Sequence, residues 1–295
     1  MIDLHTHTNH SDGTDSLEQI LKNAEESNIE VLSITDHDSV GAYLELEENP
    51  SFRNLYSGKI IVGSELKTFY DKVSIEILAY GIDYKKIRIH KYDAFQMQKE
   101  ILEKYKKIAN ELGLKYDKNE FYIDRKNPCK QWASFVLATE ILKHDENKEI
   151  IQKIGEFTPT SFFRVHQSNK ESVFYYDESY ASIDINETIS RIHEAGGLAF
   201  LAHGFIYPFK DKTKTIEEIL TTTKIDGMEC MYPLFSDEER KIAFDLCKKH
   251  NKYMSGGTDY HAKNKPDIML GTGINNNVNI EYELIKPWID RIKLK

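Results

Sequence analysis

The sequence predicts an α/β fold with a mostly helical insertion. Short apolar runs, each followed by a helical pattern, alternate through roughly the first ninety residues and again from residue 183 onward. This alternation is typical of β/α units that build a largely parallel sheet. Long charged helical segments replace it between residues 88 and 180. We therefore expect one domain built from residues 1–87 and 181–295, with residues 88–180 as a helical insertion that caps its active site.

The N-terminal part of the domain is expected to contain four strands and two helices. The strands are expected at residues 2–4, 31–34, 60–62 and 74–80, and the helices at residues 16–27 and 40–47. Ser16 is a candidate N-cap of the first helix, because a serine hydroxyl accepts hydrogen bonds from the free amides of a first turn.

The insertion is expected to begin with helices at residues 90–112 and 132–142, followed by a polar, irregular and aromatic-rich stretch at 145–180. The first of these helices carries an apolar stripe made of Phe95, Ile101, Leu102, Tyr105 and Ile108, as a helix with one buried face does. In the C-terminal part, helices are expected at 183–195, 216–221, 236–250 and 282–293, and strands at 196–202, 227–230 and 253–255.

Composition and charge argue against several classes of protein. The 295 residues are 40% hydrophobic and 29% charged, and no apolar run reaches the roughly 18 residues of a membrane span. We expect no membrane interaction and no secretory signal. The three cysteines form no CxxC pair, which favours a cytoplasmic location. A net charge of −9 argues against long nucleic acids but not against nucleotides, since bound cations can supply positive charge.

Metal-ligand side chains recur at the ends of the expected strands. The chain begins MIDLHTHTNHSDGT, and strand alternation places His5 and His7 on one face, where two imidazoles can hold one metal ion. Further candidates at strand ends are His37, Glu65, His203, Asp259 and His261. Because chemistry in β/α folds collects at the C-terminal ends of parallel strands, we expect these side chains to meet.

Together with Asp12, these residues form a set of nitrogen and oxygen ligands without a thiolate. Such a set suits Zn, Mn or Fe(II) rather than the oxygen shells of Ca or Mg. The set exceeds what one ion needs, so we expect two or three divalent ions, bridged by Glu65 or another carboxylate. Ions about 3.5–4 Å apart can clamp a phosphoryl oxygen and activate a water as hydroxide, which attacks phosphorus in line.

Other acidic and histidine residues are expected to play lesser parts. Asp36 and Asp38 flank His37 and are expected to support it or to cap a helix. His10 is expected in a loop without contact to metal. Surface positions are expected for His90, His144, His166, His193 and His250.

Five ordered motifs carry a resemblance to a known family. DLHTHTNHSDGT, SITDHDSV, GSEL, GGLAFLAHG and GGTDYHA resemble the motifs of the PHP (polymerase and histidinol phosphatase) family of metal-dependent phosphoesterases. The SDGT and TDHD forms look most like its stand-alone branch of small nucleotide phosphatases and 5′–3′ exonucleases. The motifs span residues 3–271, nearly the whole chain. The resemblance implies a distorted (β/α)7 TIM-like barrel with a di- or trinuclear centre at its C-terminal face.

The resemblance also implies roles for particular residues. One ion would be bound by His5, His7, Glu65 and Asp259, and a second by Asp12, His37 and His261. Glu65 would bridge to a third ion, completed by His203 and Glu76. The catalytic residues expected within this set are Asp12, Glu65, His203 and Asp259.

Two departures from the family pattern affect the site. Glu76 stands where this branch has a histidine ligand; a carboxylate is harder than imidazole, which favours Mn or Fe over Zn or leaves the third site empty. The insertion also lacks the Arg-Pro-His-type segment with which relatives bind substrate phosphate. Lys130 and Arg164 are the candidates for that role here, with Lys130 acting as a point charge.

We therefore expect a phosphoric ester hydrolase that releases phosphate from a small molecule. The expected substrate is a nucleotide, either a 5′-monophosphate or a 3′,5′-bisphosphate, whose base stacks on Trp132 or other aromatics of the insertion, unless these aromatics form a core of their own. The alternatives are a histidinol-phosphate phosphatase, a 5′–3′ exonuclease on short oligonucleotides, and a non-catalytic metal-binding module. The sequence does not determine the oligomeric state.

Overall fold

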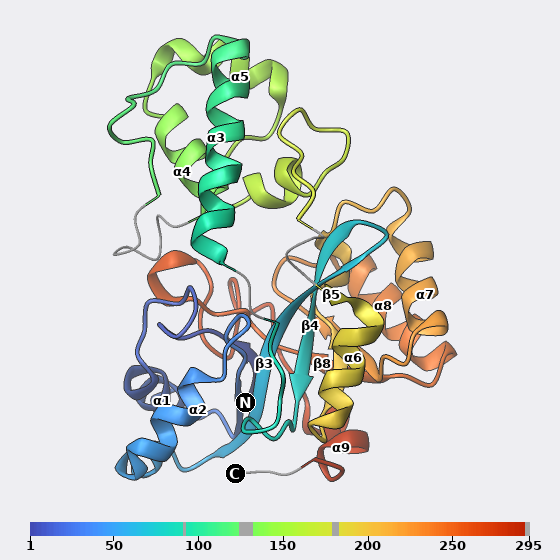
Figure 1. Cartoon of the computed structure of the whole chain (residues 1–295). Coiled ribbons are helices and arrows are strands. Elements are labelled where there is room, and N and C mark those ends of the chain that lie inside the picture. The colour runs from blue at the N-terminus through green and yellow to red at the C-terminus, as the bar shows by residue number, and fades with distance from the viewer. Residues whose placement is uncertain (91–92, 124–131, 179–182, 293–295) are drawn as a thin grey trace. The chain divides into compact units, whose positions relative to one another are not determined.

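The computed structural model describes residues 1–90, 93–123, 132–178 and 183–292, and Figure 1 traces the chain. The chain forms two compact units. Unit 1 consists of Met1–Tyr70, Ser74–His90 and Ile183–Lys295, and unit 2 of Asp71–Val73 and Lys91–Ser182. Capping of the site by the insertion stays a prediction.

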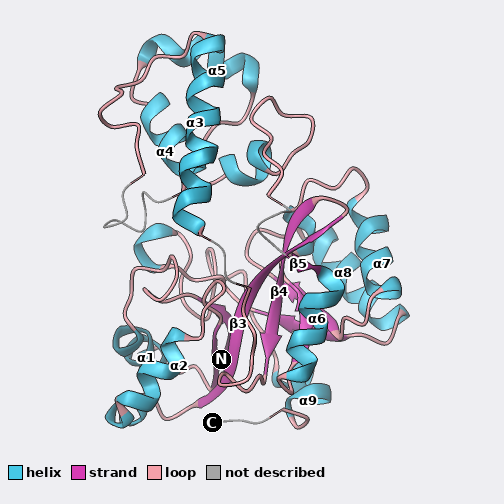
Figure 2. Cartoon of the chain, in the orientation of Figure 1, coloured by secondary structure: helices cyan, strands magenta, loops and turns pink. Residues whose placement is uncertain are grey.

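Unit 1 is built around a mixed sheet, which Figure 2 shows in magenta. In the described residues its strands are β1 (Ile2–Thr6), β2 (Val31–Ile34), β3 (Lys59–Tyr70), β4 (Val73–Tyr80), β5 (Ile183–Asp184), β6 (Leu198–Leu201), β7 (Gly227–Met231) and β8 (Tyr253–Gly256). The order is β1-β2-β3-β4-β6-β7-β8, and β5 pairs with β3. Strands β1, β2 and β3 pair in parallel, as do β6, β7 and β8, whereas β4 is antiparallel to β6.

The sheet curls until its two ends meet at one point. The amide of Asp259, just beyond β8, donates to the carbonyl of His5 on β1 at 2.7 Å, and the amide of His7 donates to Tyr260 at 2.9 Å. A curled α/β sheet is therefore confirmed. A complete barrel of seven β/α units is not confirmed: β3 and β4 are joined directly by Asp71 and Lys72, both with positive φ, where a β/α unit would place a helix.

The helices of unit 1 lie along the sheet (Figure 1). They are α1 (Leu17–Glu26), α2 (Gly41–Glu48), α6 (Ile185–Glu194), α7 (Lys212–Thr222), α8 (Asp237–Lys249) and α9 (Tyr282–Ile289), with short 3-10 turns at Pro50–Leu55, Gly204–Ile206 and Ala262–Asn264. Ser16 caps α1 as expected, and its side chain accepts from the Gln19 amide. Ser236 caps α8 in a reciprocal pair with Glu239, which satisfies two amides that the helix leaves free.

One face of the sheet packs against the C-terminal helix. Leu4, Leu78 and Phe200 are fully buried there with Trp288 of α9. The Trp288 ring lies 5.4 Å from that of Tyr80, and its Nε1 donates to the Met254 carbonyl at 2.9 Å. This packing buries apolar side chains of the strands against α9. Polar side chains of the strands lie elsewhere, toward the strand ends.

Unit 2 consists of helices joined by loops (Figure 2). Its helices are α3 (Ala94–Leu112), α4 (Ala133–Ile141) and α5 (Lys148–Ile154), with a 3-10 turn at Asp145–Asn147 and a π-helical turn at Phe163–Gln167. The expected stripe of α3 is buried at Ile101, Leu102 and Tyr105. Phe121, Phe157, Phe162 and Phe174 join the same core, so these aromatics serve the insertion itself.

Two expectations about this region are wrong. Residues 145–180 are not wholly irregular, because α5 and the π-helical turn lie there. His166 is not on the surface: it is buried, its Nε2 lies 2.6 Å from the Glu156 carbonyl, and its ring packs on Phe162. Its aromatic neighbours in the sequence were the local sign of burial. None of the described helices combines the length and apolar character needed to cross a bilayer.

The close approach of β8 to β1 leads to a prediction. A Cβ at Gly257 would lie 2.3 Å from the His5 Cβ and 2.4 Å from the His5 amide nitrogen. We expect Gly257→Ala to lower the free energy of unfolding by about 1–3 kcal/mol, because these backbones must separate. Urea denaturation measures the change. Wild-type stability in this variant would contradict the close approach.

Candidate metal centre

The sheet of unit 1 brings together all nine predicted ligands, most of them at or beyond the C-terminal ends of parallel strands, with Glu65 in the middle of β3 and Glu76 within the antiparallel β4. His5 lies on β1 and His7 just beyond it. His37 follows β2, and its backbone forms an isolated parallel β-bridge with Glu65 on β3. Glu76 comes from β4, His203 follows β6, and Asp259 and His261 follow β8. Asp12 comes from the loop after β1. The strand-end argument predicted that seven of these side chains lie together, and they do, whereas Asp12 and Glu76 were not part of that argument; the ligand roles of all nine remain a prediction.

Glu65 lies at the centre of this cluster. Its Oε2 is 3.1 Å from His5 Nε2, 3.2 Å from His7 Nε2 and 3.2 Å from His37 Nδ1. Its Oε1 is 2.9 Å from His203 Nε2. One buried carboxylate thus faces four imidazoles, which come from three segments of the chain.

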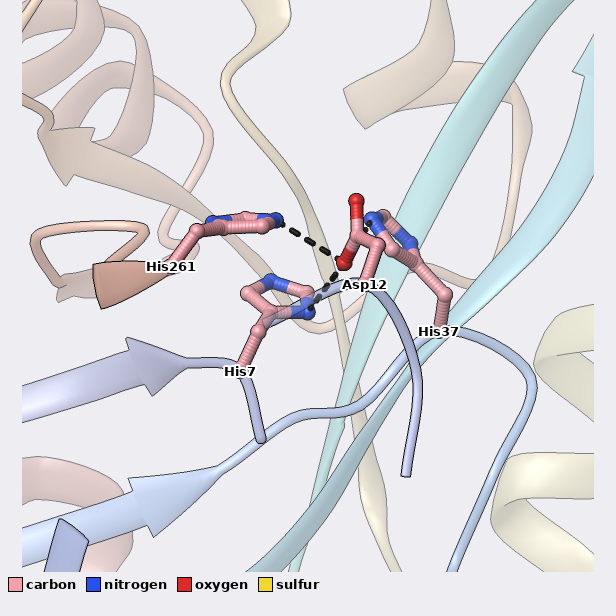
Figure 3. Close-up of side chains that lie close together, drawn as sticks. All are labelled: His7, Asp12, His37 and His261. Atoms are coloured by element: carbon pink, nitrogen blue, oxygen red, sulfur yellow. Dashed lines mark ion pairs between the residues drawn. The ribbon is translucent and has the colours of Figure 1, made fainter. Parts of the chain in front are cut away.

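Asp12 is the centre of a second group, drawn in Figure 3. Its Oδ1 is 3.0 Å from His261 Nε2 and 3.7 Å from both His7 Nδ1 and His37 Nε2. The three rings point toward this carboxylate (Figure 3). This group unites the residues that the resemblance gives to the second ion and adds His7.

Asp259 and Glu76 complete the acidic side of the cluster. Asp259 Oδ1 lies 3.3 Å from both His7 Nε2 and His261 Nδ1. Glu76 Oε1 lies 3.3 Å from His37 Nδ1, and its Oε2 lies 3.5 Å from His203 Nε2. The ligand atoms of the cluster form three sets, and within each set they lie close enough together to hold an ion. The sets are His5, His7, Glu65 and Asp259; His7, Asp12, His37 and His261; and His37, Glu65 and Glu76.

The cluster has a buried side and an open side. The side chains of His5, His7 and Glu65 are fully buried, whereas those of Asp12, His37 and Glu76 are 28%, 25% and 22% exposed. A molecule that approaches from solvent therefore meets Asp12, His37 and Glu76 first.

Burial and close opposite charges shift the pKa values of the cluster. Burial opposes ionisation of Asp12, Glu65 and Asp259, yet neighbouring histidines, and Lys265 for Asp259, hold the pKa of each carboxyl well below its usual value. Burial also opposes protonation of His7, but Asp259 and Glu65 raise the pKa of His7 to about 9. Burial lowers the pKa of His261 to about 4, so this ring is neutral and able to bind metal at pH 7.

These residues fit divalent metal ions. Asp12 Oδ1 and His7 Nε2 are buried without a hydrogen-bond partner. Asp12 Oδ1 nevertheless lies near histidine nitrogens, and His7 Nε2 lies near carboxylate oxygens. A buried polar atom without a partner is costly, and an ion placed among these atoms would satisfy it. The neutral imidazole of His261, the ionised carboxylates and the absence of thiolate in the cluster agree with Zn, Mn or Fe(II).

Two aspartates fix the loops that carry ligands. Asp36 accepts from the Thr8 amide, the Thr8 hydroxyl and the Ser11 hydroxyl, each at 2.7 Å, which holds the loop that leads to Asp12. Asp3 accepts from the Thr258 amide at 2.9 Å and its hydroxyl at 2.6 Å, next to Asp259. The expected supporting role of Asp36 agrees with these contacts, and Asp38 likewise accepts from the Lys67 amide at 3.1 Å.

Other supporting side chains were missed from the sequence. Tyr232 and Lys265 donate to Asp259 Oδ2 at 2.7 and 2.6 Å, which turns Oδ1 toward the histidines. The hydroxyl of Tyr207 accepts from the Glu76 amide at 2.8 Å. Glu229 contacts His5 and His203. A lone acid in the apolar strand GMECM was a usable sign for Glu229, whereas nothing local marks Lys265.

The backbone at His203 is strained. Its φ is +25°, a left-handed conformation that costs a non-glycine residue about 1–3 kcal/mol and persists only where the surroundings enforce it. Asp259 also has a positive φ, of 58°. Such outliers cluster at functional sites, and here both belong to predicted catalytic residues.

The remaining candidates lie elsewhere. His10 pairs with Glu45 at 2.6 Å; His144, His193 and His250, all partly exposed, pair with Glu140, Asp226 and Glu217. Arg164 lies in the π-helical turn of unit 2, and Lys130 lies outside the described residues. Their predicted phosphate-binding roles are untested.

Comparison with known proteins shows what this chain is similar to. The PHP domain model matches residues 3–132, which confirms the family resemblance. A curated relative named 5′-3′ exoribonuclease, from Haemophilus influenzae, is 26% identical over 88% of this chain and 89% of its own length. A phosphoribosyl 1,2-cyclic phosphate 1,2-diphosphodiesterase from Eggerthella lenta is 22% identical over 88% of this chain and 94% of its own. The solved structure of a proposed metal-dependent phosphoesterase from Bifidobacterium adolescentis shares the fold, with a TM-score of 0.65 at 19% identity over 99% of this chain and 96% of that one.

The raised pKa of His7 leads to a prediction about pH. In the metal-free protein His7 keeps its proton up to about pH 9, above the ordinary 6.5. Its interactions therefore stabilise the metal-free fold below pH 6.5, and this stabilisation is lost as pH rises through 9. A metal ion must displace that proton, so we expect metal affinity to rise from pH 6.5 to pH 9. Titration calorimetry in buffers of different ionisation enthalpy measures the protons released; an affinity that is constant over this range would contradict the prediction.

Proposed function

We propose that this chain, whose residues 3–132 match the PHP domain, is a metal-dependent phosphoesterase. One observation carries the proposal: the buried Glu65 faces four imidazoles, and Asp12 and Asp259 each lie against two of these rings. Such a group of carboxylates and imidazoles can hold two or three divalent ions. The names of relatives, all hydrolases of phosphate esters, support this reaction class.

The proposed substrate is a phosphate monoester of a small molecule, namely a nucleoside 5′-monophosphate or 3′,5′-bisphosphate. The chemistry that divalent ions supply when bound is activation of a water and neutralisation of charge on phosphoryl oxygens. The chain's own residues would hold these ions: Glu65 and Asp259 on the buried side, and Asp12, His37 and Glu76 on the open side, where a phosphate can approach. Tyr232 and Lys265 keep Asp259 oriented.

A 5′–3′ exonuclease acting on short oligonucleotides is the second candidate. It is favoured by the alignment with the Haemophilus influenzae relative, which is named an exoribonuclease and matches over 89% of its length. The net charge of −9 favours short substrates, because binding of long strands needs many Lys and Arg contacts to phosphate. The cytoplasmic location remains a prediction.

Phosphate release from a panel of compounds tests the function. The panel holds nucleoside 5′- and 3′-monophosphates, 3′,5′-bisphosphates, histidinol phosphate and short 5′-phosphorylated RNA, each with Mn²⁺ and with chelator. Chelator-sensitive release from a nucleotide supports the first candidate, and stepwise loss of 5′ nucleotides from RNA supports the second. Silence across the panel with metal bound would overturn both and favour a non-catalytic module.

His37 offers a direct test with a matched control. We expect His37→Ala to lower kcat/KM by more than roughly 100-fold, because loss of a group that merely supports a ligand already costs about 10–100-fold. His10→Ala removes a neighbouring histidine that is 29% exposed and pairs with Glu45, and its activity should stay within about threefold of wild type. Equal effects of the two substitutions would contradict the assignment of His37.

Glu76 tests the third ion. We expect Glu76→Ala to bind one ion fewer than wild type, because Glu76 would lose its place beside His37 and His203. Glu76→His restores the histidine of the family pattern and should retain the ion with a preference shifted from Mn toward Zn. Metal analysis of purified protein after dialysis gives the count. Unchanged stoichiometry in Glu76→Ala would show that Glu76 is not a ligand.

A further inference from the structure

Glu229 is a buried carboxylate outside the predicted ligand set. It lies on β7 between the apolar side chains of Met228 and Cys230, and its solvent exposure is zero. Its Oε1 is 3.1 Å from His5 Nδ1, and its Oε2 accepts from the His203 amide at 2.9 Å. One carboxylate therefore contacts two predicted ligands that belong to different ions.

The contact with Oε1 determines which nitrogen of His5 is available to metal. An ionised carboxylate can only accept hydrogen bonds, so His5 Nδ1 must carry the hydrogen. His5 Nε2, which lies 3.1 Å from Glu65 Oε2 and 3.5 Å from Asp259 Oδ1, is then the nitrogen that can give its lone pair to a metal ion. A metal-ligating histidine commonly donates its other ring hydrogen to a carboxylate in this way, which fixes its tautomer and orientation.

The contact with Oε2 acts on a strained segment. His203 has a left-handed backbone with φ of +25°, and its amide is held by Glu229. Its ring presents Nε2 to Glu65 Oε1 at 2.9 Å. Glu229 thus holds one ligand through its ring and the other through its backbone, and both ligands face the two oxygens of Glu65.

We propose that Glu229 is a positioning residue that sets the His5 tautomer and fixes His203, so that occupancy of two metal positions depends on one side chain. This inference rests on the proposed function, because it needs a metal centre at Glu65. It adds a residue that binds neither metal nor substrate.

Glutamine cannot replace Glu229. Both partners of the carboxylate donate, and an amide has one accepting oxygen and one donating NH2. If the NH2 faces His5, the ring must accept at Nδ1 and carry its hydrogen on Nε2, which blocks metal binding there. If the NH2 faces the His203 amide, two donors oppose each other at the strained segment. Either orientation damages one of the two metal positions.

The test compares Glu229→Gln with wild type by metal affinity and by NMR. Competition with a chelating dye gives the Zn²⁺ dissociation constants, and we expect Glu229→Gln to weaken at least one site by about 10–100-fold. Long-range ¹H–¹⁵N spectra of the zinc-loaded wild-type protein should show His5 with hydrogen on Nδ1. Hydrogen on Nε2 of His5 in wild type would overturn the inference without any variant.

Asp226 supplies a matched control in the same unit. It precedes β7 and, like Glu229, accepts from one histidine and one backbone amide, although both contacts are made by its Oδ2: His193 Nε2 at 2.7 Å and the Ala199 amide at 2.8 Å. Asp226→Asn should keep zinc affinity within about threefold of wild type. Equal losses in both variants would mean a general effect on stability and would overturn the inference.

The remaining outcomes separate the inference from the function on which it rests. Wild type that binds no Zn²⁺ and releases no phosphate refutes the proposed function. Wild type that binds Zn²⁺ while Glu229→Gln binds it equally well refutes only the role of Glu229. If Glu229→Gln does not fold, Glu229→Asp is used, whose shorter side chain cannot reach both partners and should weaken zinc binding similarly.

Discussion

The structure of unit 1 depends on one interaction, the contact of the buried Glu65 carboxylate with four imidazoles. Glu65 comes from the middle of β3, and the rings come from β1 and from the segments that follow β1, β2 and β6. A charged group without water must be paired and hydrogen-bonded. The segments that carry these rings therefore have to meet at Glu65, and the curl of the sheet brings β8 and Asp259 to the same point.

The supporting contacts follow from this constraint. Several predicted ligands are held by side chains that are not ligands themselves. Asp36 holds the loop after β1, Tyr232 and Lys265 hold Asp259, and Glu229 holds His5 and His203. Ligands fixed in this way need little reorganisation when a metal binds, which is the condition for strong and selective coordination.

The division into a buried and an open side connects this arrangement to function. The rings and carboxylates nearest to β1 and β3 are closed to solvent, whereas Asp12, His37 and Glu76 remain partly exposed. Ions on the closed side would exchange slowly, and those on the open side would remain accessible to a phosphate group. A phosphoesterase needs both properties, a stable centre and an open face for substrate.

The sequence by itself determined the chemical nature of the site and the edge of the sheet on which it lies. His5, His37, Glu65 and His203 follow or end apolar runs, and the C-terminal ends of parallel strands share one edge. Only the tertiary structure decided the direct turn from β3 to β4 and the partners of each ligand. Strand periodicity is a local property, whereas the contact of His5 with Glu229 joins residues 224 positions apart, and no local pattern encodes such a pair.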